Sequence, residues 1–294
     1  MSSWEDDFSS WAQPPAKTEQ ERCANAEKAA RNAILASNKL KYKDIKIFAQ
    51  GSYRNNTNVK KDSDVDIGIL SRDTFFFDLP NGSTRDQFGI NPATYSYEDF
   101  KNDVQDALIS YFGASAVKRG NKAFDIHENS YHVDSDVAPF FEHRRYSSSG
   151  GYSSGVELKP DNGGRVINWP EQHYDNGVSK NTATSRRFKS LVRIIKSLCN
   201  YMADQGVALA KSTPSFLIEC LVWNVPNDNF GNYTYSDDVR ACLAFLYNNT
   251  ISQDKCNDWG EVSELKYLFR GGQKWTPEQA HSFISAAWNY VGFK

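Results

Sequence analysis

Residues 45–52 read IKIFAQGS, and after a spacer of eleven residues positions 64–67 read DVDI. The first stretch is an apolar run that ends at Gly51-Ser52, a pattern typical of a strand that turns into a short helix. In the second stretch alternate residues of a strand share a face, so Asp64 and Asp66 point one way and the aliphatic residues point the other way, into a core. Two carboxylates on one face repel each other, and the pair therefore indicates a bound cation.

A third acidic stretch lies far downstream, where residues 133–139 read VDSDVAP. Asp134 and Asp136 would share a strand face, and either could complete the site. Two divalent ions about 3.5–4 Å apart, held by such carboxylates, are a known device for phosphoryl transfer. Gly51 lets the backbone approach an anion closely and Ser52 adds a hydroxyl donor, so the whole set predicts a triphosphate-binding loop beside a two-metal site.

Composition bounds the class of protein. The chain has 294 residues, of which 39% are hydrophobic and 14% aromatic, enough for two domains with a sizeable core. Its net charge of −2 excludes a strongly basic nucleic-acid-binding protein. We expect a soluble protein of the cytoplasm that does not enter a membrane, because no apolar run approaches about 18 residues and no signal peptide is visible. Five cysteines form no C-x-x-C pair, which argues against a zinc ribbon or a disulfide framework: Cys23, Cys199, Cys220, Cys242 and Cys256.

The pattern of residues divides the chain into three parts. Residues 1–14 are polar and are expected to form a flexible N-terminal arm, residues 15–165 mix strand and helix patterns, and residues 166–294 are mainly helical. Three aromatic side chains of the arm could dock onto the rest of the chain: Trp4, Phe8 and Trp11. A loop is expected to begin at Phe75. We expect strands at 44–50, 64–70, 122–128 and 131–138, and helices at 16–38, 98–112, 183–204, 214–224, 236–248, 261–270 and 276–291.

Two features of the helical part could contact a nucleotide. One predicted helix carries a basic stripe beside its apolar face, formed by Lys189, Arg193, Lys196 and Asn200. Lys196 could reach a triphosphate, or the stripe could be an ordinary solvated face. Ser215 and Phe216 open the next helix and could offer a hydroxyl to phosphate and a ring to a base, a stacking contact worth about 1–3 kcal/mol. The alternative is an N-cap serine followed by a core aromatic residue.

These residues together resemble the motifs of the polymerase-beta superfamily of nucleotidyltransferases. More narrowly, the chain is similar to the bacterial cyclic-oligonucleotide synthases related to animal cyclic GMP–AMP synthase and oligoadenylate synthase. The superfamily motif of Gly-Ser followed by Asp-x-Asp matches residues 51–52 and 64–67, although Gln50 occupies a usually apolar position. The family's third acid matches Asp136, which the resemblance favours over Asp134.

The resemblance implies an α+β, bilobal fold. A polymerase-beta-like nucleotidyltransferase core, with a mixed sheet and helices, would be followed by a helical lobe of the oligoadenylate-synthase type. It also implies two Mg²⁺ ions, or Mn²⁺ in their place, with catalytic and metal-binding roles for Asp64, Asp66 and Asp136. The nucleotide-binding residues that it implies are Gly51, Ser52, Lys196, Ser215 and Phe216.

The resemblance further implies a reaction and a biological role. Ribonucleoside triphosphates, with ATP and GTP among those expected, would be condensed into a cyclic di- or trinucleotide with release of pyrophosphate. The product would be a second messenger for anti-phage defence that a downstream effector senses, and the enzyme is expected to be a monomer that needs no nucleic-acid ligand. Two alternatives remain: nucleotidyl transfer to a protein hydroxyl or an RNA 3′ end, and a nucleotide-binding protein without catalysis. The bases, the linkage and the ring size are not encoded in any motif that we recognise.

Overall fold

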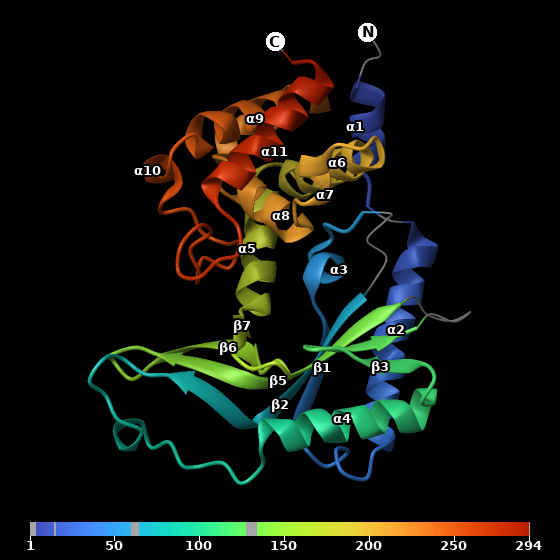
Figure 1. The fold of residues 1–294 in the computed structure, drawn as a ribbon, viewed down its shortest axis with the longest axis vertical. Helices are drawn as coiled ribbons and strands as arrows, with labels where there is room; N and C mark the ends of the chain where they lie inside the picture. Colours follow the sequence, from blue (N-terminus) through green and yellow to red (C-terminus); the bar gives the residue numbers. More distant parts are fainter. Residues whose placement is uncertain (1–3, 15, 60–64, 128–133, 294) are drawn as a thin grey trace. The chain divides into compact units, whose positions relative to one another are not determined.

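The computed structural model describes residues 4–14, 16–59, 65–127 and 134–293 (Figure 1). Its chain forms two compact units, which we describe separately. The sheet unit contains Ala16–Tyr53 and Ser63–Pro170, and the helical unit contains Met1–Pro15, Arg54–Asp62 and Glu171–Lys294. The expected architecture, a mixed sheet with helices plus a helical part, is therefore confirmed.

The described strands of the sheet unit form one seven-stranded mixed sheet. Its order is β1-β2-β5-β4-β3, with β6 paired to β5 and β7 paired to β6. The central pair, β2 and β5, is parallel, and the other pairs are antiparallel. The strands are β1 (Ile45–Ala49), β2 (Val65–Asp78), β3 (Val117–Arg119), β4 (Phe124–Ile126), β5 (Ser135–Tyr146), β6 (Tyr152–Leu158) and β7 (Val166–Asn168). The helices are α2 (Lys17–Ala36), α3 (Gly51–Asn55, whose last residues belong to the helical unit), η1 (Asp86–Phe88) and α4 (Tyr97–Phe112).

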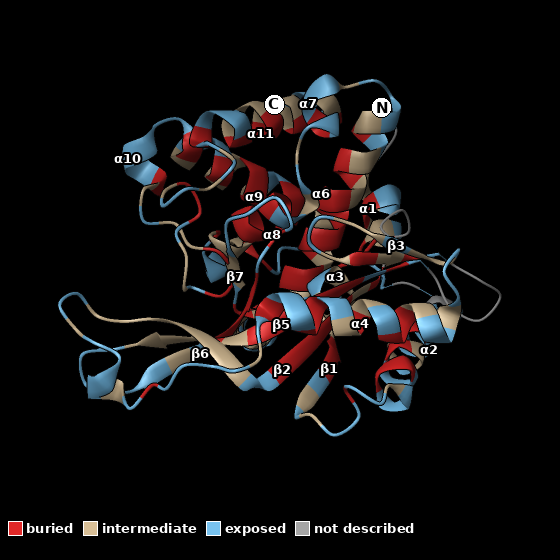
Figure 2. Cartoon of the chain, turned by 60° about the horizontal axis from the view of Figure 1, so that its bottom comes forward, coloured by how far each residue is buried: buried red, intermediate tan, exposed pale blue. Residues whose placement is uncertain are grey.

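One face of this sheet is a hydrophobic core. Val65, Ile67 and Ile69 of β2 are buried as predicted, whereas Asp66 between them is partly exposed. Helices α2 and α4 pack on the sheet and on each other, and Figure 2 shows buried residues along the strands and exposed ones on the outer side of α4. Phe100 of α4 is fully buried in this core, a contribution of about 1.5–3 kcal/mol.

The central strands run further than the sequence predicted. The expected loop at Phe75 is wrong, because β2 continues to Asp78 and pairs with Glu142–Arg145 of β5 after a register shift between Ser71 and Phe75. The bulge interrupts the simple alternation of side chains on which the prediction depended. Phe76 nevertheless packs against the core, with its ring centroid 5.4 Å from that of Phe141.

The helical unit is built around α6. Its helices are α1 (Glu5–Trp11), α5 (Pro170–Ala183), α6 (Arg187–Asp204), α7 (Ala208–Lys211), α8 (Ser215–Trp223), η2 (Asn227–Asn229), α9 (Tyr235–Thr250), α10 (Gln253–Cys256) and α11 (Pro277–Val291). The apolar stripe of α6 is buried among residues of α8, α9 and α11. At the start of α11 the predicted capping box is present: Thr276 accepts from the Gln279 amide, and the Gln279 side chain accepts from the Thr276 amide.

Two parts of this unit differ from the helix predictions. Helix α5 was not predicted, because its apolar pattern is weak, and the helix predicted at 183–204 begins at Arg187, as α6. Between α5 and α6, Ser185 and Arg186 adopt positive φ angles of 50° and 68°, which ends one helix before the next begins. The helix expected at 261–270 is absent from the described residues there, which form turns and a bridge between Gly260 and Tyr267.

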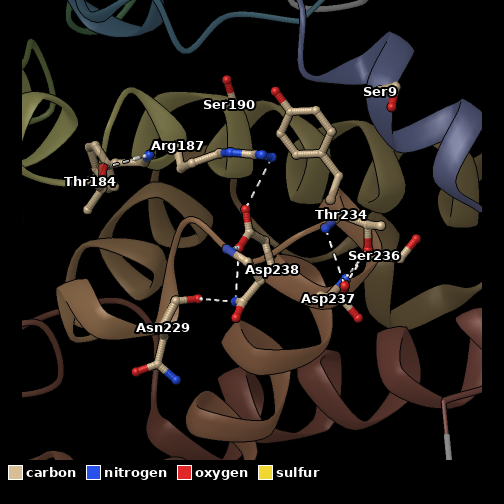
Figure 3. Close-up of polar contacts among 12 residues, drawn as sticks. Ser9, Thr184, Arg187, Ser190, Asn229, Thr234, Ser236, Asp237 and Asp238 are labelled. Carbon is tan, nitrogen blue, oxygen red and sulfur yellow. Dashed lines mark hydrogen bonds and ion pairs between the residues drawn. The ribbon is translucent and has the colours of Figure 1, made fainter.

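Polar contacts fix the start of α9 (Figure 3). Thr234 and Asp237 form a capping box. Asp238, one residue further, is fully buried and accepts hydrogen bonds of 2.8 and 3.0 Å from the backbone and side-chain nitrogens of Asn232. The Arg187 guanidinium of α6 lies 3.4 Å from the same carboxylate, so α6 and α9 are joined by an ion pair as well as by apolar packing.

The N-terminal segment is ordered differently from the expected flexible arm. Residues 5–11 form α1, and Phe8 is fully buried in the core of the helical unit. Trp4 and Trp11 pack against that core, as the possible docking of the arm's aromatic residues anticipated. Burial of three large aromatic side chains outweighs the polar character of the segment.

All five cysteines are buried and free of disulfide bonds. Among the described residues, no helix is both long and apolar enough to span a membrane.

Candidate active site

Acidic residues form a row across neighbouring strands of the sheet unit. Asp66 of β2 and Asp136 of β5 are direct partners in the parallel register, and Asp125 of β4 is the antiparallel partner of Asp136. Register partners project from the same face, and neighbouring strands lie about 4.8 Å apart. Asp66 and Asp125 are partly exposed and Asp136 is exposed, so the row offers carboxylate oxygens at the surface of the sheet.

The turn from β1 into α3 lies directly against this row. Gly51 has a φ angle of +66°, and a Cβ atom built on it would lie 2.1 Å from Oδ2 of Asp66. The Gln50 amide donates a 2.8 Å hydrogen bond to the Asp66 carbonyl, which ties the turn to β2. Ser52 follows in the first turn of α3 and is partly exposed. The glycine is therefore required both by the backbone conformation and by the close approach of the carboxylate.

The other two acidic residues predicted for the site are Asp64 and Asp134. Asp64 lies outside the described residues. Asp134 is exposed and immediately precedes β5, where its carbonyl accepts a 3.0 Å hydrogen bond from the Val65 amide. The strand register thus brings Asp136, rather than Asp134, beside Asp66.

The residues present fit a magnesium site. Mg²⁺ is bound in proteins by one or two carboxylates together with water and substrate phosphates. Asp66 and Asp136 supply two carboxylates in register, and the lack of a side chain at Gly51 lets the Asp66 carboxylate lie against the turn. Within the described part of the chain, which leaves out Asp64, no three His, Cys, Asp or Glu side chains are grouped closely enough to hold a metal ion by themselves.

In the helical unit, Lys196 belongs to a buried polar network. Its ammonium is 2.9 Å from Oε2 of Glu219 in α8. Oε1 of the same carboxylate is 2.9 Å from Nε2 of His173 in α5, and Oε2 accepts a 2.7 Å hydrogen bond from the Thr57 hydroxyl. Burial alone would raise the pKa of Glu219, but the Lys196 charge, His173 and the Thr57 hydroxyl together hold it below its ordinary value.

Two other residues of the basic stripe on α6, Lys189 and Arg193, are also buried, whereas Asn200 is partly exposed. Arg193 is 5% exposed and Lys189 is 8% exposed, which excludes an ordinary solvated face. The Arg193 guanidinium donates to the carbonyls of Ala12, at 2.9 Å, and Asn56, at 2.6 Å. Burial lowers the pKa of Arg193 to about 10 and also lowers that of Lys189. The stripe thus concentrates positive charge inside the helical unit.

Ser215 and Phe216 are the first two residues of α8. Pro214 is the N-cap residue, and Phe216 is 38% exposed, so the alternative of an N-cap serine followed by a core aromatic residue is wrong. The Phe216 ring lies 5.8 Å from the His173 ring and 5.9 Å from Trp275, measured between centroids. An exposed ring supported by two others is suited to stacking on a base.

The sequence analysis overlooked three residues of these two clusters: Asp125, Glu219 and Thr57. Asp125 had a local signal, since it is a single acid between the buried strand residues Phe124 and Ile126. Glu219 lies four residues after Ser215 and hence on the same side of α8. Thr57 had no signal, because its partner Glu219 is 162 residues away.

Comparison with known proteins identifies two matching family models. The model for the cGAS/DncV-like nucleotidyltransferase C-terminal helical domain matches residues 175–292. The model for a nucleotidyltransferase domain matches residues 31–126, which include β1, α3 and β2.

Similar proteins match over nearly the whole chain. The sequence is 46% identical over 290 residues to the cyclic dipyrimidine nucleotide synthase CdnE of Cecembia lonarensis, with 98% of each chain covered. It is 44% identical over 292 residues to the protein of the same name from Legionella pneumophila, again with 98% of each chain covered. The structure of the Elizabethkingia meningoseptica CdnE cyclic dinucleotide synthase with GTP and Apcpp has a TM-score of 0.82 and 33% identity, and the match covers 98% of this chain and 99% of that one.

Proposed function

This chain belongs to the cGAS/DncV-like nucleotidyltransferases, and we propose that it condenses two pyrimidine ribonucleoside triphosphates into a cyclic dinucleotide. That it is a nucleotidyltransferase of the cyclic-nucleotide synthase kind, as the sequence predicted, is confirmed by its full-length relatives. Transfer to a protein hydroxyl or an RNA end is not favoured, because the relatives that match 98% of this chain are cyclic-nucleotide synthases.

The choice of pyrimidines depends on one observation. The two dipyrimidine synthases are 46% and 44% identical to this chain, whereas the synthase whose structure contains GTP is 33% identical. All three proteins match nearly the whole chain, but the dipyrimidine synthases are clearly more similar to it in sequence. This difference supports UTP and CTP as substrates, in place of the ATP and GTP expected from the sequence.

The proposed reaction consists of two equivalent transfers. An acceptor ribose hydroxyl attacks the α-phosphorus of a donor triphosphate, a new P–O bond forms, and the bond to the pyrophosphate oxygen breaks. The hydroxyl proton is transferred to a carboxylate at the acidic row, for which Asp136 is our candidate. A second transfer, in which the two nucleotides exchange roles, closes the ring and releases a second pyrophosphate.

Asp64, Asp66 and Asp136 would hold two Mg²⁺ ions, with Mn²⁺ as a substitute. When bound, such ions neutralise the charge that develops on the phosphates and lower the pKa of the attacking hydroxyl. The support from this chain is the register of Asp66 with Asp136 and the close approach of the Asp66 carboxylate to Gly51.

Each unit contains candidates for nucleotide contacts. In the sheet unit, the Gly51 backbone and the Ser52 hydroxyl are candidates for binding the triphosphate. In the helical unit, Lys196 and Ser215 are candidates for phosphate contacts, and the exposed ring of Phe216 is a candidate for stacking on a base.

We also propose the biological setting that the resemblance implied. The product would be a second messenger of anti-phage defence that a downstream effector senses, and the enzyme would be a cytoplasmic monomer that needs no nucleic acid. Size-exclusion chromatography with light scattering tests the monomer, and activity that persists after nuclease treatment tests independence from nucleic acid.

The proposed reaction is tested by incubating the purified protein with all four ribonucleoside triphosphates and Mg²⁺, and separately with Mn²⁺. The small molecules are then treated with phosphatase and analysed by mass spectrometry. We expect a phosphatase-resistant cyclic dinucleotide that contains only pyrimidines. A cyclic product that contains purines would refute the proposed choice of bases. Triphosphates that remain unreacted with Mg²⁺ and also with Mn²⁺ would contradict the synthase activity.

A further inference from the structure

Phe216, at the start of α8, contacts two other rings of the helical unit. The His173 ring of α5 lies 5.8 Å away at an interplanar angle of 35°, and the Trp275 ring lies 5.9 Å away at 43°, both measured between centroids. Phe216 is exposed to solvent, whereas His173 is buried and Trp275 is partly exposed. The exposed ring is therefore backed by two rings that are more buried than it is.

A hydrogen bond fixes each of the two backing rings. Nε1 of Trp275 donates to the Leu268 carbonyl at 2.7 Å. Nε2 of His173 lies 2.9 Å from Oε1 of Glu219. Burial would raise the pKa of Glu219, but the Lys196 charge and the bond to His173 hold it below its ordinary value, so the carboxylate is ionised. An ionised carboxylate only accepts hydrogen bonds, and Nε2 of the histidine therefore carries the hydrogen.

The two oxygens of Glu219 have separate partners. Oε2 is 2.9 Å from the Lys196 ammonium and accepts a 2.7 Å hydrogen bond from the Thr57 hydroxyl. Within the described residues, Oε1 bonds only to His173. Glu219 follows Phe216 by three residues and hence lies on the same side of α8. The helix that carries the exposed ring thus also carries the group that orients one of the rings behind it.

We propose that His173 and Trp275 form, together with Phe216, an aromatic site for the pyrimidine base of a substrate, and that Glu219 is a positioning residue of this site. The inference rests on the proposed function, because base stacking at Phe216 is part of it. A ring that is fixed before the base arrives loses less conformational freedom on binding. We therefore expect these residues to influence the affinity for the base and not the affinity for the phosphates.

The test measures by calorimetry, in the presence of Mg²⁺, how tightly the full-length protein binds two probes. One is a UTP analogue with a non-hydrolysable bridge between its α- and β-phosphates. The other is inorganic tripolyphosphate, which has no base. Phe216→Ala removes the stacking ring itself, and it should raise the Kd of the UTP analogue about 10-fold or more while the Kd of tripolyphosphate changes less than about twofold.

Two substitutions of His173 separate the ring from its hydrogen bond. His173→Gln retains a donor for Oε1 of Glu219 and removes the ring, whereas His173→Phe retains a ring and removes the donor. Because both the ring and its orientation are required, each variant should raise the Kd of the UTP analogue about 3- to 10-fold and leave that of tripolyphosphate unchanged. Trp275→Leu removes the other backing ring and should have an effect of the same size.

Glu219→Asp tests the same hydrogen bond from its other end. The substitution keeps the negative charge but draws the carboxylate back by one methylene, which withdraws Oε1 from His173. It should raise the Kd of the UTP analogue as His173→Phe does, and it decides the role of Glu219 if His173→Phe does not fold.

His281 of α11 provides a matched control in the same unit. Its ring lies 4.6 Å from that of Tyr247, and its Nδ1 is 3.1 Å from Oγ1 of Thr250. Tyr247 is 40% exposed, close to the 38% of Phe216. His281→Gln thus also removes a hydrogen-bonded ring beside an exposed aromatic side chain, and it should leave both Kd values unchanged.

The outcomes are distinct for each part of the inference. It is overturned if His173→Gln binds the UTP analogue as tightly as the wild type, or if its loss is equally large for tripolyphosphate. Wild-type affinity in His173→Phe would remove the positioning role of Glu219. Unchanged affinity in Phe216→Ala would instead refute the base stacking of the proposed function, and a wild-type protein that makes no cyclic product would refute the synthase activity but leave this binding comparison decisive.

Discussion

Asp66 and Asp136 in the sheet unit and Glu219 in the helical unit are the same chemical group in opposite environments. Asp66 and Asp136 lie in register on neighbouring strands and keep contact with solvent. Glu219 is buried, and Lys196, His173 and Thr57 satisfy its two oxygens. The row of carboxylates is thus accessible to a cation from solvent, whereas Glu219 is enclosed by the groups that bind it.

The difference separates two kinds of contribution. A solvent-accessible carboxylate that can bind a cation contributes mainly to chemistry, because water screens its charge in the folded protein. A carboxylate with an internal cation contributes to stability, because removing it leaves a buried positive charge without a partner. Substitutions in the two places should therefore have opposite profiles.

The largest expected effect is on activity in the sheet unit. Asp66→Asn should lower kcat by about 1,000-fold or more, the scale of loss for a residue that acts as part of a catalytic unit. Its melting temperature should change far less than that of a Glu219 variant, since Asp66 is partly exposed and Glu219 is buried. Cyclic-dinucleotide formation and differential scanning calorimetry measure the two quantities, and a substantially active Asp66→Asn variant would remove Asp66 from the metal site.

The next effect is on stability in the helical unit. Glu219→Ala should lower the free energy of unfolding by about 3–5 kcal/mol, the usual cost of removing one partner of a buried ion pair. Urea denaturation followed by circular dichroism measures it. A loss below about 1 kcal/mol would show that Lys196 finds another anion or water, and the contrast with Asp66 would disappear.

The same carboxylate predicts a pH dependence. The pKa of Glu219 in the folded state is lowered below the ordinary 4.5, so its contribution is fully present above pH 4.5 and is lost as the pH falls below that value. The wild type should therefore lose more stability than Glu219→Gln between about pH 6 and about pH 3. Parallel slopes for the two proteins in urea denaturation would contradict the assignment.

A smaller effect on activity comes from the turn beside the row. Gly51→Ala places a methyl group where Oδ2 of Asp66 lies and should lower kcat about 100-fold by displacing the carboxylate. Gly82→Ala is a matched control, since Gly82 has a φ angle of +79° but nothing within 4 Å of an added Cβ atom. Both variants should lose about 1 kcal/mol of stability through backbone strain, and only Gly51→Ala should lose activity. Equal activities would show that the contact with Asp66 is not required.

The smallest effect is expected at the N-terminal segment of the helical unit. Glu5 accepts hydrogen bonds from the amides of Tyr235 and Ser236 at the start of α9, which stabilises that helix end. Glu5→Gln should lower the free energy of unfolding by about 0.5–1 kcal/mol and leave kcat unchanged. A change in kcat would mean that the N-terminal segment influences the reaction.

What could be predicted from the sequence depended on the range of the interactions. The strand at Ile45–Ala49, the turn at Gly51 and the capping box at Thr276 follow from residues within a few positions of one another. The alternation in Asp64-Val65-Asp66-Ile67 correctly indicated which face of β2 is buried, because alternation is a local property of strands.

Long-range features could not be predicted in this way. Glu219 meets Thr57 across 162 residues and His173 across 46, and no local pattern records such a contact. Helix α5 escaped prediction because its sequence is largely polar, and its position in the fold rather than its composition stabilises it. The extension of β2 past Phe75 depends on pairing with β5 after a register shift, which only the folded sheet reveals.

The most direct test of the account is a comparison of two reactions with the same enzyme preparation. One reaction contains only UTP and CTP with Mg²⁺, and the other contains only ATP and GTP with Mg²⁺. Both are analysed for phosphatase-resistant product by mass spectrometry. The Asp66→Asn variant, tested under the same conditions, is the blank. The account predicts a cyclic dipyrimidine dinucleotide in the first reaction, none in the second and none in the blank. A cyclic product from the purines alone, or product of equal yield from Asp66→Asn, would contradict it.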